Sequence, residues 1–219
     1  MRRYINKAIA TLGLKNLFFA GSKSYWEKRY LRGGNSGSGS YNRLSEFKAE
    51  ILNNFCTTHS IEHVVEFGSG DGNQLSLSNY HHYVGLDVSP TAVEKCMAKF
   101  EKYPTRSFYL LGTVDLKDEK FKCELSLSLD VIFHLVEDSV FEEYIYNLFS
   151  VSTDYVIIYS SNYNRREAAH VRHRCFTYFV EQNIHNFVLE QTIKNRYPFE
   201  ASNSDLTSFA DFYIYKKTN

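Results

Sequence analysis

The sequence has no long apolar run, no close pair of cysteines and no excess of one charge. Without about 18 consecutive apolar residues, no segment is expected to span a membrane. None of its four cysteines, Cys56, Cys96, Cys123 and Cys175, is in a CxxC pair. This argues against a zinc knuckle or a disulfide scaffold and favours free thiols in a reducing cytoplasm. Because 25 basic residues balance 25 acidic ones, no global positive field exists to attract nucleic acid.

The composition that is present fits one globular domain. The chain has 219 residues, of which 43% are hydrophobic and 23% are charged. We expect an N-terminal helical segment over residues 1–41 and a main domain over residues 42–219. In the first, Ile5, Ile9 and Leu12 fall on one face of a short amphipathic helix. This helix would pack on the domain or on a partner subunit, or touch a membrane surface weakly, and the oligomeric state is left open.

A stretch rich in glycine and serine, GGNSGSGS at residues 33–40, follows the segment that holds the only tryptophan. Too few residues precede it for a domain linker, so we interpret it as a mobile loop beside a site. The aromatic and basic residues just before it would form a lid over a cofactor or an acceptor. A disordered surface loop is the alternative. The lid residues would be Tyr25, Trp26, Arg29 and Tyr30.

From residue 61 onward, short apolar strands alternate with helical stretches, which indicates parallel β–α–β units with helices on both faces. The last two strands follow one another without a helix and suit an antiparallel edge. The predicted fold is therefore α/β, a Rossmann-like seven-stranded sheet that is mostly parallel and has an antiparallel edge strand. The predicted strands are 61–67, 80–87, 107–111, 125 to near 130, 154–160, 185–194 and 209–216, and the predicted helices are 42–58, 90–103, 137–149 and 166–183.

The first of these strands runs into a loop with the pattern E-x-G-x-G-x-G, from Glu66 to Gly72. Glycines let the backbone turn sharply and approach a ligand, which open α/β sheets bind at the carboxyl ends of their strands. A second acid, Asp87, ends the next strand about 20 residues on, where a carboxylate can hold both hydroxyls of a ribose. Dinucleotide-binding folds share this acid, so an NAD-dependent oxidoreductase or epimerase is an alternative, although the chain lacks their GxGxxG spacing.

Four stretches, in order, resemble successive motifs of class I S-adenosylmethionine-dependent methyltransferases and cover roughly residues 60–165. The resemblance implies that S-adenosylmethionine is the cofactor and S-adenosylhomocysteine the product. The stretches are VVEFGSGDGNQL at 64–75, VGLDVSP at 84–90, LSLDVIFHLVED at 127–138 and YVIIYSSN at 155–162.

The same resemblance implies which residues would bind the cofactor. In many members an acid after the third strand contacts the adenine amino group, and here Gly112, Thr113 and Asp115 are the candidates. The methionine portion would be cradled by Glu66, Gly68, Ser69 and Gly70, the ribose held by Asp87, and the adenine packed on Val88, with Asp130 also in contact.

A narrower resemblance bears on the acceptor. The stretches SYWEKRYLRGGNSGSGS at 24–40, LSLDVIFHLVED at 127–138 and HVRHRCF at 170–176 are similar to bacterial methyltransferases that accompany capsule, lipopolysaccharide and glycosyltransferase genes. This resemblance implies O-methylation of a sugar or of a sugar-linked group, which could be phosphorylated.

Methyl transfer from a sulfonium is an in-line displacement, so the protein must align the nucleophile and remove its proton. A sugar hydroxyl is a poor nucleophile at neutral pH, which calls for a base or a metal beside the methyl group. The resemblance places Asp130 and His134 there, and histidine suits a general base because its pKa lies near neutrality. A structural histidine and a capping aspartate are the alternatives.

A second group of basic residues is predicted on the helix at 166–183. The spacing of three places His170 and His173 on one helical face, with Arg174 on the same side. Together with Arg172, these side chains would grip an anionic acceptor such as a phosphate, or supply the base. A solvated basic face is the alternative.

A metal-assisted reaction would need oxygen ligands after the fourth and fifth strands. Asp130 supplies the first, but the fifth strand is followed by Ser160, Ser161 and Asn162, without a carboxylate. Hard cations prefer more acids, so we expect a metal-independent base and assign Asn162 to acceptor binding. A module that binds the cofactor without turning it over is a third interpretation.

Overall fold

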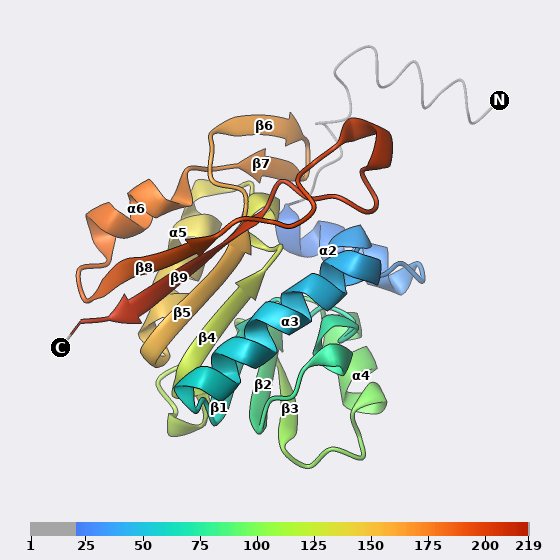
Figure 1. The fold of residues 1–219 in the computed structure, drawn as a ribbon. Helices are drawn as coiled ribbons and strands as arrows, with labels where there is room; N and C mark the ends of the chain where they lie inside the picture. The colour runs from blue at the N-terminus through green and yellow to red at the C-terminus, as the bar shows by residue number, and fades with distance from the viewer. Residues whose placement is uncertain (1–20, 219) are drawn as a thin grey trace.

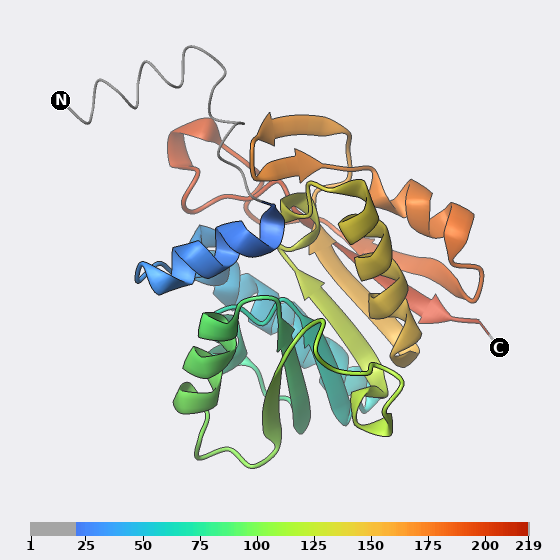
Figure 2. The same ribbon diagram turned by 180° about the vertical axis from the view of Figure 1, so that it is seen from behind.

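The computed structural model describes residues 21–218, so the predicted amphipathic helix at the N-terminus lies outside the described residues. The described chain forms a central sheet between two layers of helices (Figures 1 and 2). The division of the chain into 1–41 and 42–219 stays a prediction.

The sheet has seven strands in the order β3-β2-β1-β4-β5-β9-β8. β9 pairs antiparallel with both of its neighbours, and the other pairings are parallel. This arrangement confirms the predicted fold class and its antiparallel edge, which is formed by the pair β9–β8. The strands are β1 His63–Phe67, β2 His82–Asp87, β3 Arg106–Leu110, β4 Cys123–Leu129, β5 Ser152–Ser160, β8 Phe187–Ile193 and β9 Asp211–Lys217.

Helices cover both faces of this sheet, as Figures 1 and 2 show from opposite sides. α3 (Asn42–His59) and α4 (Pro90–Lys99) share one apolar cluster with the sheet, and α5 (Asp138–Ser150) and α6 (Phe176–Asn183) share the other. Because both faces are covered, β1 is buried from its second residue onward, and every residue of β4 except Glu124 is buried, including the serines that alternate with its leucines.

The start of α4 shows how the sequence sets a local boundary. The Ser89 hydroxyl accepts a hydrogen bond from the Ala92 backbone N–H at 3.1 Å, and Pro90 occupies the first turn. Serine at the cap and proline just inside it are the residues that favour a helix start. The predicted start of this helix is therefore confirmed.

The predicted helix over residues 166–183 is wrong in its first half. Residues 165–173 form a hairpin of two antiparallel strands, β6 (Arg165–Ala168) and β7 (Val171–His173), and α6 begins only at Phe176. In a strand successive side chains point to opposite sides, so Arg172 and Arg174 face one way and His173 the other. The expectation that His170 and His173 share a helical face with Arg174 therefore fails.

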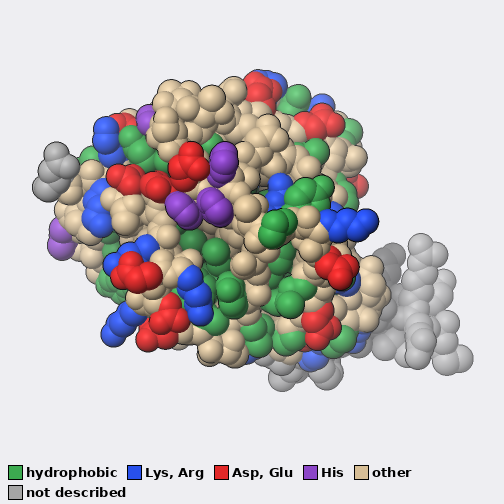
Figure 3. Space-filling view, turned by 90° about the horizontal axis from the view of Figure 1, so that it is seen from below, with side chains coloured by type: hydrophobic (Ala, Val, Ile, Leu, Met, Phe, Trp, Pro, Cys, Tyr) green, Lys and Arg blue, Asp and Glu red, His purple; other side chains and the backbone are tan. Residues whose placement is uncertain are grey.

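A further helix, α2 (Ser22–Leu31), lies across the end of the sheet where the parallel strands terminate. The opposite end carries a surface group of histidines and carboxylates, seen from below in Figure 3. The rings of His63 and His82 are stacked there 4.9 Å apart, and the His63 Nδ1 lies 3.4 Å from a Glu124 carboxylate oxygen.

Candidate active site

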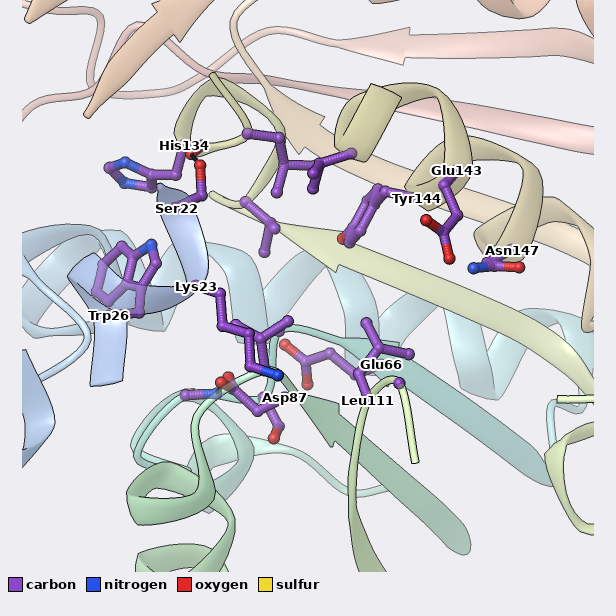
Figure 4. Close-up of a pocket in the computed structure, with 18 of the residues that line it drawn as sticks. Ser22, Lys23, Trp26, Glu66, Asp87, Leu111, His134, Glu143, Tyr144 and Asn147 are labelled. Atoms are coloured by element: carbon purple, nitrogen blue, oxygen red, sulfur yellow. Dashed lines mark hydrogen bonds between the residues drawn. The ribbon is translucent and has the colours of Figure 1, made fainter. Parts of the chain in front are cut away.

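A cavity of about 1110 Å³ opens at the carboxyl ends of β1, β2 and β4, beneath α2 (Figure 4). This is where open α/β sheets bind their ligands. We call it the cofactor cavity. Its walls include the glycine loop, the loop after β3, the segment after β4, and α2.

The glycine loop is held in a conformation that only glycine adopts easily. Gly68 and Gly70 have φ angles of 89° and 57°. An added Cβ at Gly68 would collide with Val131, and one at Gly70 with the Ser36 hydroxyl. The backbone N–H of Gly68 donates to the Leu86 carbonyl at 2.7 Å, which ties the loop to β2. Gly68 and Gly70 line the cavity as predicted.

Two buried carboxylates form the floor of the cavity. Glu66 is 4% exposed and accepts a hydrogen bond from the Tyr83 hydroxyl at 2.6 Å. Burial raises the pKa of Glu66 to about 7, although the Tyr83 hydrogen bond acts in the opposite direction. Asp87 accepts from the backbone N–H groups of Gly70 and Ser89, each at 2.9 Å. Burial also raises the pKa of Asp87, to about 6.

Asp130 lines the cavity at the end of β4 and is held by a lysine that the sequence analysis missed. The Lys48 ammonium, on α3, lies 2.7 Å from Oδ2 of Asp130, and the lysine side chain has no exposed surface. Asp130 has a φ of 60°, which is uncommon for a residue with a side chain. The ion pair with Lys48 fixes the direction of the carboxylate at the cavity wall.

His134 lines the same cavity. It is the last residue of the short helix η5 (Ile132–His134), which follows β4. Its Nδ1 lies 3.1 Å from the carbonyl oxygen of His170. A carbonyl only accepts, so Nδ1 carries the proton and Nε2 keeps a free lone pair. Burial lowers the pKa of His134 to about 4, so the imidazole is neutral at pH 7. The geometry therefore gives a neutral imidazole at the cavity wall.

The other two candidate histidines are placed apart. His170 lies in the turn between β6 and β7, where its ring stacks on Tyr25 at 4.3 Å and lies parallel to the His134 ring at 6.1 Å. His173 is 1% exposed, and its Nδ1 lies 2.7 Å from the Ser161 hydroxyl. Neither residue lines the cofactor cavity. His134 is thus the one predicted histidine that the structure brings to the cavity.

Arg172 and Arg174, predicted to bind the acceptor, also point away from the cofactor cavity. Both guanidinium groups face the start of α5 and reach the same carboxylate oxygen of Asp138, at 2.8 and 3.0 Å. They also donate to the backbone carbonyl of Val136. The strand geometry of β7 places them there, whereas the predicted helix would have grouped Arg174 with His170.

Two more residues predicted to bind the acceptor or the cofactor have partners within the protein. The Asn162 side chain accepts from the Thr177 backbone N–H at 3.2 Å and donates to the Thr177 hydroxyl at 2.8 Å, so it is used at the start of α6. Thr113 turns its hydroxyl to the Leu110 carbonyl at 2.8 Å and does not line the cavity. Its neighbours Gly112 and Asp115 do line it. Of the three candidates after β3 for the adenine contact, Gly112 and Asp115 therefore line the cavity and Thr113 does not.

α2 is fastened to the protein on both sides of the cavity. At one end the Ser22 hydroxyl donates to Glu137, at the start of α5, at 2.6 Å. Further along, Glu27 accepts from the hydroxyls of Ser89 at 2.5 Å and Thr91 at 2.7 Å, at the start of α4. α2 thus bridges the two sides of the cleft.

The predicted lid residues divide into two groups. Trp26 and Tyr30 line the cavity, and Figure 4 shows Trp26 beside His134. Tyr25 stacks on His170 instead, and Arg29 donates from Nε to the Asn35 carbonyl at 2.6 Å. Tyr25 and Arg29 therefore belong to α2 but do not line the cavity.

Several residues that line the cavity were not predicted from the sequence, because they lie in no recognised motif. Lys23 extends from α2 toward Asp87 (Figure 4). Ser36, in the glycine- and serine-rich loop, accepts from the Asp71 backbone N–H at 2.9 Å. The Tyr144 hydroxyl donates to the Phe67 carbonyl at 3.0 Å and lies 2.7 Å from the Ser128 hydroxyl. The loop over residues 33–40 was singled out by composition, but its contact with the glycine loop was not predicted.

Within residues 21–218 no three side chains of His, Cys, Asp or Glu are grouped so as to hold a metal ion. None of the helices in this range has the length and apolar character that a membrane crossing requires.

No protein-family model and no curated protein matches the sequence. Solved structures do match. The N-methyltransferase NodS from Bradyrhizobium japonicum WM9, in complex with S-adenosyl-L-homocysteine, has a TM-score of 0.70 and 11% sequence identity, and the match covers 91% of this chain and 100% of NodS. The chain has the Rossmann-like fold of class I methyltransferases.

Two further structures share the methyltransferase fold with this chain. Magnesium protoporphyrin IX methyltransferase from Synechocystis PCC 6803, with bound S-adenosylhomocysteine, gives a TM-score of 0.59 and 14% identity over 80% of this chain and 85% of that one. The methyltransferase domain of bacterial CtHen1 gives 0.60 and 16% over 80% of this chain and 100% of that one. The named proteins differ in what they methylate, so the methyltransferase fold by itself does not name an acceptor.

Proposed function

We propose that the protein is an S-adenosylmethionine-dependent methyltransferase. The observation that carries the proposal is the pair of buried carboxylates, Glu66 and Asp87, at the ends of adjacent strands beneath the glycine loop. Within residues 21–218 neither carboxylate forms an ion pair, and burial raises the pKa of both, so burying the two together is unfavourable. A cofactor with a cationic amino acid portion and a ribose would satisfy both.

The proposed contacts follow the cavity wall. Asp87 would accept from the ribose hydroxyls, and Glu66 with the backbone of Gly68 and Gly70 would hold the methionine portion. The adenine would pack between Val88 and the loop after β3, where Gly112 and Asp115 replace Thr113 as its neighbours. Asp130, fixed by Lys48, would face the ammonium or sulfonium side of the cofactor.

We propose that the acceptor is a hydroxyl of a sugar or of a sugar-linked group. S-adenosylmethionine supplies a methyl group already activated on a sulfonium. The acceptor oxygen forms a bond to the methyl carbon as the carbon–sulfur bond breaks, and the hydroxyl proton passes to Nε2 of His134. The free Nε2 lone pair of His134 at the cavity wall supports this role. Trp26 offers an aromatic face for a sugar ring beside it.

A protein base fits the side chains better than a metal does. One oxygen of Asp130 is taken by Lys48, and the amide of Asn162 is taken by Thr177. The pair of oxygen ligands that a divalent cation would need after β4 and β5 is therefore already engaged.

α2 is proposed to act as a lid. Because it is fastened to α4 through Glu27 and to α5 through Ser22, it would have to loosen for the cofactor to enter. Closure would exclude water from the methyl group and place Trp26 and Tyr30 over the acceptor.

The oxidoreductase alternative is less well supported. The antiparallel β9 between β5 and β8 departs from the parallel sheet of dinucleotide-binding folds. An NAD-dependent oxidoreductase or epimerase would be expected to use a Tyr-xxx-Lys pair. The sequence contains one such spacing, Tyr213 and Lys217. Both lie on β9, outside the cofactor cavity, so they cannot serve as a catalytic pair there.

Separate calorimetric titrations with S-adenosylmethionine and NAD⁺ test the proposal. We expect S-adenosylmethionine to bind and NAD⁺ not to, and Asp87→Ala to weaken binding by about 1–3 kcal/mol because ribose hydroxyls lose their acceptor. Asp154→Ala, which removes an exposed carboxylate at the far end of the sheet, is the matched control and should bind as the wild type does. Preference for NAD⁺, or no binding of either compound, would reject the proposal.

A further inference from the structure

A second cavity, of about 540 Å³, lies between the β6–β7 hairpin, the start of α5, and α6. Within residues 21–218 it shares no lining residue with the cofactor cavity, and the function proposed above gives it no role. Its walls are rich in guanidinium groups, so we call it the arginine cavity. The arginines are Arg165, Arg166, Arg172 and Arg174.

The charges of this cavity are not balanced by its own side chains. Four guanidinium groups and two carboxylates, those of Asp138 and Glu142, line the cavity, and Arg165 is paired with Glu167, which lies outside the lining. Arg172 and Arg174 share a single oxygen of Asp138, and that carboxylate is 65% exposed. Arg166 has no ion-pair partner among residues 21–218. A net positive wall of this kind attracts an anion.

Part of the wall is rigid, unlike the freely solvated arginines of an ordinary basic surface. The Arg174 side chain is 8% exposed and lies over the Phe141 ring at 4.7 Å. Its guanidinium donates to the backbone carbonyls of Leu135 and Val136, and Arg172 donates to Val136 as well, at 3.1 Å. Guanidinium groups fixed in advance lose little conformational entropy when they bind an oxyanion.

The rim adds groups suited to a sugar. Tyr178, on α6, is 65% exposed and borders the cavity, and Phe179 lies beside it. Side-chain amides complete the rim: Gln182 and the Asn164 nitrogen remain for a ligand, whereas Asn183 bonds Phe179 and Tyr146 and the Asn164 oxygen accepts from the Cys175 N–H. An exposed aromatic ring can pack on a sugar face while amides bond its hydroxyls. Free phosphate would contact only the arginines, because it has no sugar ring to pack on Tyr178.

We propose that the arginine cavity binds an oxyanion, a phosphate or a carboxylate, carried on a sugar. That this sugar is part of the methyl acceptor rests on the proposed function, whereas the binding itself does not. The wall that Arg172 and Arg174 hold, Leu135–Val136, directly follows His134. An acceptor anchored here would therefore be held close to the proposed base.

The test is calorimetric titration of the whole protein, without cofactor and at low salt. The probes are inorganic phosphate, glucose 1-phosphate, glucuronate and glucose. We expect glucose 1-phosphate or glucuronate to bind more tightly than glucose, and the better of the two identifies the anion as phosphate or carboxylate. Inorganic phosphate should bind more weakly than glucose 1-phosphate because it cannot use the aromatic rim. Equal or absent binding of all four probes in the millimolar range overturns the proposal.

Variants decide whether binding occurs at the arginine cavity. Arg166→Gln, at an exposed position, should weaken binding of the better probe about tenfold, and Arg172→Gln should do the same. Asp138→Asn removes the shared negative charge and should tighten binding. Arg32→Gln, an exposed arginine outside both cavities, is the matched control and should have no effect. If Arg32→Gln weakens binding as much as Arg166→Gln, the attraction is nonspecific and the proposal fails.

The link to the acceptor has its own readout. In a methylation assay with a phosphorylated or acidic sugar, Arg166→Gln should raise the KM for that acceptor and leave the affinity for S-adenosylmethionine unchanged. An unchanged KM would separate the arginine cavity from the acceptor without affecting the evidence for methyl transfer.

Discussion

The Lys48 ammonium on α3 lies 2.7 Å from the Asp130 carboxylate at the end of β4, and 82 positions separate the two residues. The lysine is fully buried and also lies over the Tyr159 ring, at 5.3 Å. A buried ion pair of this kind fixes a charged group in one direction at the edge of the cofactor cavity. It joins the helix that precedes the sheet to the strand end where methyl transfer is proposed.

Lys48→Met should destabilise the protein by about 3 kcal/mol, because the partly buried Asp130 carboxylate would lose its counter-ion. The measurement is the free energy of unfolding in urea at pH 7. The double variant Lys48→Met with Asp130→Asn should recover a large part of the loss, since the unpaired charge is then absent. A loss below about 1 kcal/mol for the single variant would mean that the pair behaves like an exposed one.

The buried carboxylates predict how stability depends on pH. The folded-state pKa values of Glu66, about 7, and Asp87, about 6, lie above the ordinary values of 4.5 and 3.8. Between these limits the folded protein binds more protons than the unfolded chain, so the free energy of unfolding falls as the pH rises. We expect the protein without cofactor to lose stability between pH 5 and pH 7.

Glu66→Gln isolates the larger of the two contributions. The amide keeps an oxygen that can accept from the Tyr83 hydroxyl but carries no titrating charge. Thermal unfolding of this variant should depend less on pH, and at pH 8 the variant should be more stable than the wild type by about 2–3 kcal/mol. Parallel pH profiles for the two proteins would contradict the burial of an ionising group at this position.

The neutral state of His134 can be measured without an acceptor. ¹⁵N NMR should show the proton on Nδ1 and a lone pair on Nε2, because the His170 carbonyl accepts from Nδ1. The ring should stay neutral down to about pH 5, since burial lowers its pKa to about 4. His134→Gln assigns the signal by its loss. In methylation assays this variant should lower kcat about 100-fold or more, with cofactor affinity unchanged.

His170→Gln is the matched control for this reaction, because it removes the stacked ring but keeps the backbone carbonyl that orients His134. It should keep most of the activity. If both variants lose activity equally, His134 is not distinguished as the base.

The fold was predictable because its signals are local and repeated. A few neighbouring residues are enough to predict each element. Examples are the apolar strands that end near Glu66 and Asp87, and the helix capped at Ser89. The hairpin at residues 165–173 was missed because its alanine, glutamate and arginine residues favour a helix in isolation. The contacts of Arg172 and Arg174 with Val136, and with Asp138 at the start of α5, outweigh that preference in the folded protein.

The candidate site was predictable only where one motif holds several of its residues. Glu66, Gly68 and Gly70 share one loop, whereas Lys48 meets Asp130 only through the packing of α3 on the sheet. A signal for Lys48 did exist, because it falls among the apolar positions of the predicted helix at 42–58, next to Phe47. A charge on such a face needs a buried partner, and the sequence alone does not name it.

The hydrogen bonds of Glu27 that hold α2 to the start of α4 should control access to the cofactor cavity. Glu27→Gln weakens the bonds to Ser89 and Thr91, so amide hydrogen exchange in α2 should become faster while the core of the sheet is unchanged. S-adenosylmethionine should then dissociate faster. Lys28→Ala, at the exposed neighbouring position, is the control and should exchange as the wild type does. Unchanged exchange in Glu27→Gln would show that other contacts hold α2 in place.

Gly70→Ala tests the contact between the glycine loop and the loop at residues 33–40. The φ of 57° costs an alanine about 1 kcal/mol, and its Cβ would in addition collide with the Ser36 hydroxyl. Gly33→Ala has a similar positive φ, 79°, but its Cβ would meet nothing within 4 Å, so it reports strain alone. Both variants should lose some stability in urea unfolding. Only Gly70→Ala should also lose S-adenosylmethionine binding in calorimetry, because the collision displaces the backbone that would hold the cofactor.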